Sequence, residues 1–148
     1  MGSAYFIVIA VAAAMNLIAG IWGAALWLRR SVSIDGNLGT VLFWYLLRAA
    51  QAASVIAVLF CLVLYIWGRE PDSAIHYLYV VLPLVISLIA EVIRAGAAIH
   101  ETRGIDVAAL PAERQMRMAL AILRRETGIM ASSSLICAFL LLRALEKL

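Results

Sequence analysis

The chain has 148 residues, of which 66% are hydrophobic and 14% are charged, and its formal net charge at pH 7 is +3. Soluble domains are about 45–50% apolar and about 25% charged, so a globule of this size could not enclose so many apolar side chains. The two cysteines and the lack of a glycine period exclude a disulfide scaffold and a collagen-like chain. The composition therefore indicates a multispanning membrane protein and excludes a soluble enzyme.

Four apolar stretches are long enough to cross a bilayer, which takes about 20 helical residues. They cover residues 4–28, 40–67, 74–98 and 118–144. Turn-forming residues lie in the first two breaks, at 35–36 and 68–73. In the third break, residues 111–123 alternate apolar and charged side chains at helical spacing, which predicts a short amphipathic helix in the membrane interface. The sequence thus predicts one all-α domain over residues 1–148, an integral membrane four-helix bundle with antiparallel up-down topology.

The basic residues indicate how such a bundle would be oriented. Cytoplasmic loops carry an excess of Lys and Arg. Nine basic residues fall on the side of the first and third loops and three on the other: Arg29, Arg30, Arg48, Arg94, Arg103, Arg114, Arg117, Arg124 and Arg125 against Arg69, Arg143 and Lys147. We expect a multi-pass protein of the cell inner (plasma) membrane, of the bacterial kind, with both termini extracytoplasmic. The basic charge is explained by anionic lipids, so we expect no nucleic-acid partner.

Charged side chains inside three of the spans lie at a similar depth. Measured from the outer helix ends, Arg48 lies about 28 Å, Glu91 about 22 Å and Glu126 about 27 Å into the membrane. An unpaired charge in the middle of a spanning helix costs about 2.5–3.5 kcal/mol, so we expect the carboxylates and guanidinium groups to pair. This predicted polar cluster, toward the cytoplasmic third of the bilayer, comprises Arg48, Gln51, Glu91, Arg94, Arg125 and Glu126.

A cluster of this kind either fixes helix register or binds a ligand. Three arginines against two acids leave an excess positive charge, so we expect it to bind an anionic lipid head group, a lipophilic cofactor or a partner helix. The chain would then be a small non-enzymatic accessory or assembly component, alone, as a homo-oligomer or in a larger membrane complex. The alternative is a small transporter or proton-conducting protein in which Glu91 and Glu126 change protonation.

A second candidate site lies near the outer ends of the spans. His76, Tyr77 and Tyr79 occur where an outer aromatic belt is expected. His76 could instead ligate a haem, which would make the chain an electron-transfer subunit. The other histidine, His100, lies about 36 Å further along the same predicted helix, so the two cannot share one metal. We therefore expect no metal site and no cofactor, with haem as the second alternative.

The sequence lacks the motifs of several known classes of intramembrane enzyme. It has no Cys-x-x-Cys pair, no aspartate lies in a predicted span, and the serines at 132–134 have no histidine at matching depth. An enzymatic role is therefore not expected.

Small residues in the first span predict close helix packing. Ala19, Gly20, Gly23 and Ala24 form two overlapping small-xxx-small pairs, which let helix backbones approach within the bundle or between protomers. Asn16, in the same span, can donate an interhelical hydrogen bond.

Overall fold

The computed structural model describes residues 3–29, 31–34, 37–68 and 74–147. It contains four long helices and one short 3-10 helix: α1 (Ser3–Leu28), α2 (Leu38–Ile66), α3 (Ala74–Thr102), η1 (Val107–Ala109) and α4 (Ala112–Leu145). These described residues contain no strand, so the all-α prediction is confirmed for them. Each of the four is long and apolar enough to cross a membrane. The turn signals predicted at 35–36 and 69–73 lie outside the described residues.

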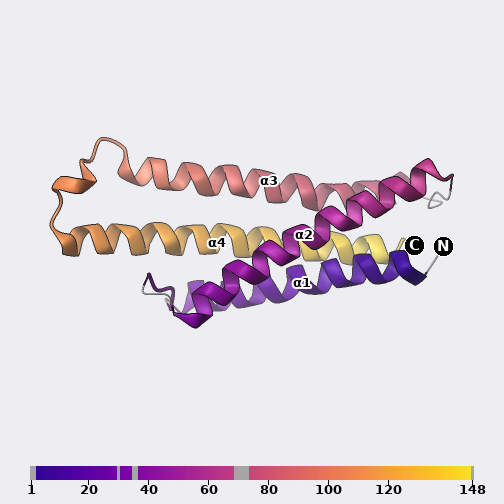
Figure 1. Ribbon diagram of the computed structural model, residues 1–148, viewed down its shortest axis with the longest axis horizontal. Coiled ribbons are helices and arrows are strands. Elements are labelled where there is room, and N and C mark those ends of the chain that lie inside the picture. Colours follow the sequence, from indigo (N-terminus) through magenta and orange to yellow (C-terminus); the bar gives the residue numbers. More distant parts are fainter. Residues whose placement is uncertain (1–2, 30, 35–36, 69–73, 148) are drawn as a thin grey trace.

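Successive long helices run in opposite directions, and the start of α1 lies at the same end of the molecule as the end of α4 (Figure 1). α4 packs against both α1 and α3, and α1 also packs against α2. The contact between α2 and α3 is smaller, and α2 crosses the other helices obliquely (Figure 1). The side of the bundle between α2 and α3 is therefore the least closely packed.

The prediction of a separate interfacial helix at residues 111–123 is wrong. Residues from Ala112 to Leu145 form one continuous helix of 34 residues, which is about 51 Å long at 1.5 Å per residue. Pro111 precedes its first turn, and no proline follows within α4 to interrupt the hydrogen bonds. The amphipathic stretch therefore continues the fourth apolar segment, and α3 and α4 together extend beyond the end of α1 (Figure 1).

Two glycines allow α1 to pack closely against its neighbours. A Cβ atom at Gly20 would lie 2.7 Å from the side chain of Leu135 in α4. One at Gly23 would lie 2.9 Å from the Cβ atom of Ala131 and would also meet the ring of Phe43. Contacts this short would force the helices apart, so these small residues serve helix approach inside the bundle.

Asn16 joins α1 to α2 in the apolar interior. Its Nδ2 atom donates to Ser54 Oγ at 2.9 Å and to the Ala12 carbonyl at 2.9 Å. Ser54 Oγ in turn donates to the Ala50 carbonyl at 3.0 Å. These bonds satisfy two buried polar side chains and fix α2 against α1. Gln51, one turn before Ser54, is thereby held opposite α3.

Candidate functional site

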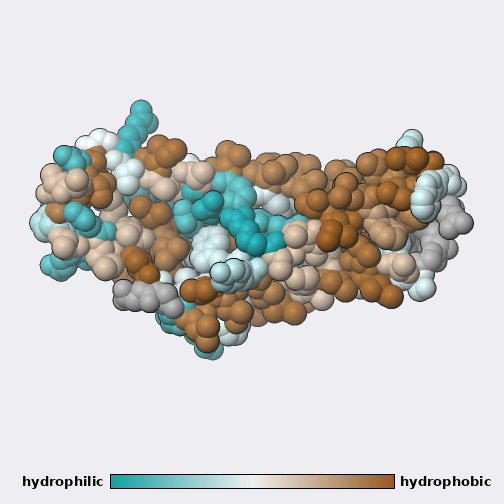
Figure 2. Space-filling model, viewed as in Figure 1, coloured by the Kyte–Doolittle hydropathy of each residue, from teal (hydrophilic) through white to brown (hydrophobic). Residues whose placement is uncertain are grey.

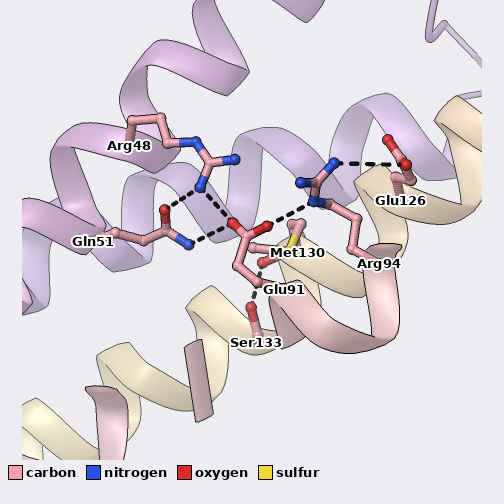
Figure 3. Close-up of polar contacts among 7 residues, drawn as sticks. All are labelled: Arg48, Gln51, Glu91, Arg94, Glu126, Met130 and Ser133. Atoms are coloured by element: carbon pink, nitrogen blue, oxygen red, sulfur yellow. Dashed lines mark hydrogen bonds and ion pairs between the residues drawn. The ribbon is translucent and has the colours of Figure 1, made fainter. Parts of the chain in front are cut away.

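The polar cluster forms where α2 faces α3. Arg48 and Gln51 come from α2, and Glu91 and Arg94 come from α3. The members of each pair are three residues apart, so both side chains project from one side of their helix. Figure 3 shows that these side chains converge on the carboxylate of Glu91.

Glu91 is the hub of this cluster because its carboxylate accepts hydrogen bonds from three side chains. Oε1 accepts from Arg48 Nη1 and, at 3.1 Å, from Gln51 Nε2. Oε2 accepts from Arg94 Nε at 2.7 Å. Arg48 Nη1 also donates to Gln51 Oε1 at 2.7 Å. Both carboxylate oxygens therefore have donors. Gln51 links Arg48 to Glu91, because it accepts a hydrogen bond from the first and donates one to the second.

Arg94 connects this group to α4 and to an aromatic ring. Its Nη1 atom lies 3.6 Å from Glu126 Oε1, and its guanidinium lies 5.8 Å from the centroid of the Trp44 ring. The side chains of Arg94 and Glu126 are 28% and 14% exposed, and that of Glu91 is 25% exposed. These three charges are thus largely enclosed by α2, α3 and α4.

Arg125 lies outside the cluster, contrary to the prediction. Its Nη1 atom donates to Glu101 Oε1 at 2.8 Å, and both side chains are exposed. Consecutive residues of a helix point about 100° apart, so Arg125 and Glu126 cannot both face Arg94. Among the described residues, the cluster holds two arginines and two glutamates, whose formal charges balance. The excess positive charge expected from the sequence is therefore absent from it.

The cluster opens sideways between α2 and α3. In Figure 2 a hydrophilic patch interrupts the apolar surface between these helices. A pocket of about 230 Å³ lies there, and its polar lining residues are Arg48, Gln51, Ser54, Ser87 and Glu91. The Arg48 side chain is 52% exposed. Both of its bonds in the cluster use Nη1, and Nη2 points away from Glu91 and Gln51 (Figure 3). Arg48 therefore lines the opening and keeps N–H donors that its cluster bonds do not use.

His76 is completely buried and hydrogen-bonded through both ring nitrogens. Nδ1 lies 3.1 Å from the carbonyl oxygen of Ala144, and Nε2 lies 2.7 Å from the hydroxyl of Tyr5. A carbonyl oxygen can only accept, so Nδ1 carries the proton and Nε2 accepts from Tyr5. A haem iron could bind His76 only if one of these two bonds broke. Among the described residues, no group of three or more His, Cys, Asp or Glu side chains could hold a metal ion.

Of the two tyrosines predicted beside His76, both of which the structure describes, Tyr77 contacts its ring and Tyr79 does not. The ring of Tyr77 lies edge-on to those of His76 and Tyr65, with centroids 6.2 and 5.8 Å away, and Tyr79 packs against the neighbouring apolar core. This region is thus a packed interior. Sequence reasoning missed Tyr5, because a single tyrosine in an apolar run carries no sign of the histidine that it will meet.

Comparison with known proteins identifies no relative. No family model matches the chain, and no curated protein or solved structure matches it.

Proposed function

We propose that the chain is a small non-enzymatic accessory or assembly protein of the inner membrane, whose polar cluster binds an anionic lipid head group. The four helices would cross the bilayer as an up-down bundle, alone, as a homo-oligomer or within a larger membrane complex. Arg48 carries this proposal, because its half-exposed guanidinium lies in an apolar face and its two cluster bonds both use Nη1. A guanidinium has five N–H donors, and a lipid phosphate is the acceptor that a bilayer supplies for them.

The depth of the cluster supports a head group as the ligand. Glu91 lies 15 residues past His76 in α3, or about 22 Å, which is about 8 Å short of the far side of a hydrocarbon core about 30 Å thick. Arg48 lies 19 residues before Trp67, or about 28 Å, at the boundary with the head groups. Leu84 and Leu88 of α3 and Val55 of α2 add apolar side chains to the pocket lining, and these suit the acyl chain of the same lipid.

Removing the charge of Arg48 is expected to reduce the amount of anionic lipid that the purified protein retains. The wild-type chain should keep phosphatidylglycerol in preference to phosphatidylcholine in native mass spectra. In Arg48→Gln the preference should fall about tenfold, because a hydrogen bond to a charged group contributes about 1.5–3 kcal/mol. Arg117→Gln is the matched control, since Arg117 is exposed and pairs with Glu113 on α4. Equal preference in the wild type and Arg48→Gln would contradict the proposal.

The alternative, a small transporter or proton-conducting protein, would use Glu91 and Glu126. Glu91 is already bonded to Arg48 and Arg94, and Glu126 faces Arg94. A transported proton would therefore have to displace a guanidinium. In liposomes under a pH gradient, we expect no proton flux above that of empty vesicles. A flux that Glu91→Gln or Glu126→Gln abolishes would establish the transporter instead.

We further propose that both termini are extracytoplasmic, because the basic residues divide nine to three between the two sides of the predicted spans. A reporter that is active only outside the cytoplasm should be active when fused after Leu148, and a cytoplasm-active reporter should be silent. The opposite result would place the polar cluster toward the outer leaflet.

A further inference from the structure

We propose a second lipid site, a groove between α3 and α4 that holds the acyl chain of an anionic membrane lipid with its head group at Arg125. The groove has a volume of about 490 Å³, and Trp27 of α1 forms part of its lining. It does not depend on the site at Arg48. At 100° per residue, the α3 residues that line it, including Ile86 and Ile93, lie on the opposite face of the helix from Ser87 and Glu91.

The walls of the groove suit a hydrocarbon chain. Isoleucine is the commonest residue of its lining, contributed by α3 and α4: Ile86, Ile89, Ile93, Ile129 and Ile136. Two serines also line it, but Ser132 Oγ donates to the Gly128 carbonyl and Ser133 Oγ donates to the Met130 carbonyl, each at 2.9 Å. Their hydroxyl hydrogens are therefore used within α4, and little polarity remains for a polar ligand.

Gly128 brings Trp27 close to α4. A Cβ atom at Gly128 would lie 2.9 Å from Nε1 of the Trp27 indole, so the ring occupies the space that a side chain would fill. Both residues line the groove. Trp27 is thus in direct contact with whatever occupies it, and its fluorescence can report the occupant.

The length of the groove matches one leaflet. From Arg125 to Ile136, its lining spans 12 residues of α4, which are 11 steps of about 1.5 Å or about 16 Å in all, and half of a hydrocarbon core is about 15 Å thick. A single acyl chain running along α4 would therefore extend from the head-group region to the middle of the bilayer.

Charge is confined to one end of the groove. Among the described lining residues, Arg125 alone is charged, and its side chain is 51% exposed. It pairs with Glu101, while the adjacent Arg124 donates from Nε to the Trp27 carbonyl at 3.3 Å. Among the described residues, Arg125 thus has a carboxylate partner and Arg124 has none. The remaining positive charge favours a lipid with an anionic head group over a zwitterionic one.

Quenching of Trp27 by brominated lipids tests this site. The chain is reconstituted in phosphatidylcholine vesicles with Trp22, Trp44 and Trp67 replaced by phenylalanine, so that Trp27 is the fluorophore. At equal mole fraction, phosphatidylglycerol with brominated acyl chains is expected to quench Trp27 severalfold more than brominated phosphatidylcholine. Equal quenching by the two lipids would show that Trp27 meets bulk lipid only, and would overturn the proposal.

Four further variants show whether the quenching arises from lipid in this groove. Arg125→Gln should make the two lipids equal, whereas Arg143→Gln, which removes an exposed cation near the other end of α4, should preserve the difference. Ser132→Leu, which fills the groove, should reduce quenching by both lipids. Arg48→Gln should leave Trp27 quenching unchanged, so failure of the lipid site at Arg48 is distinguishable. Quenching by neither lipid in the otherwise unchanged chain would show that protein covers the groove, and would also overturn the proposal.

Discussion

Glu91→Ala is expected to lower the free energy of unfolding by about 3–5 kcal/mol, the cost of leaving enclosed charges without their partner. The carboxylate accepts hydrogen bonds from Arg48, Gln51 and Arg94, so its removal affects three donors at once. Unfolding in detergent, followed by circular dichroism, measures this loss. Glu113→Ala is the control, because Glu113 is 82% exposed and its pair with Arg117 lies on the surface. A surface pair of this kind contributes about 0–1 kcal/mol.

Apolar replacements show whether the loss comes from stranded charge. Replacing Glu91 and Arg94 together by leucine should recover only part of it, because Arg48 loses its Glu91 partner and Glu126 loses Arg94. Replacing all four charged residues of the cluster by leucine should be milder than Glu91→Leu alone. Purely additive losses across the Glu91–Arg94 double-mutant cycle would show that the two residues do not interact, and would contradict this account.

The four long helices were predictable because apolar runs of this length, in so hydrophobic a chain, indicate membrane-spanning helices. The prediction and the structure differ at residues 111–123, whose charged and apolar side chains recur at the spacing of a helix. That spacing is the same for a helix lying in the interface and for the protruding first part of a long helix. Only the direction of the chain distinguishes the two, and this depends on how α3 and α4 pack beyond the end of α1 (Figure 1).

The candidate site was predictable as far as helical spacing within one segment determines it. Spacing placed Arg48 with Gln51 and Glu91 with Arg94, and the structure brings both pairs together. The same rule could have excluded Arg125, since it is adjacent to Glu126 and must point elsewhere. Contacts between helices were not predictable in this way, because they depend on the relative shift and rotation of the helices. The pairing of Arg125 with Glu101 is of this kind.

The hydrogen bond between Tyr5 and His76 is a second contact between helices that the sequence did not predict. Its loss is expected to lower the stability of the protein strongly. His76→Ala should lower the free energy of unfolding by about 2–5 kcal/mol, because it opens a void and leaves a buried hydroxyl and a carbonyl without their partner. His100→Ala is the matched control, since His100 is exposed near the end of the same helix and should change stability by less than about 0.5 kcal/mol. Detergent unfolding of the two variants gives the comparison.

A double-mutant cycle with Tyr5→Phe then distinguishes the hydrogen bond from simple packing. In the wild-type background Tyr5→Phe should cost about 1–3 kcal/mol, because Nε2 of His76 loses its donor in an apolar interior. In the His76→Ala background the same change should cost much less, since that acceptor is already gone. Equal losses of unfolding free energy in both backgrounds would show that Tyr5 and His76 are not hydrogen-bonded. A Soret band in the purified wild-type protein that His76→Ala removes would instead show that the ring ligates haem iron and that one of its two hydrogen bonds is broken.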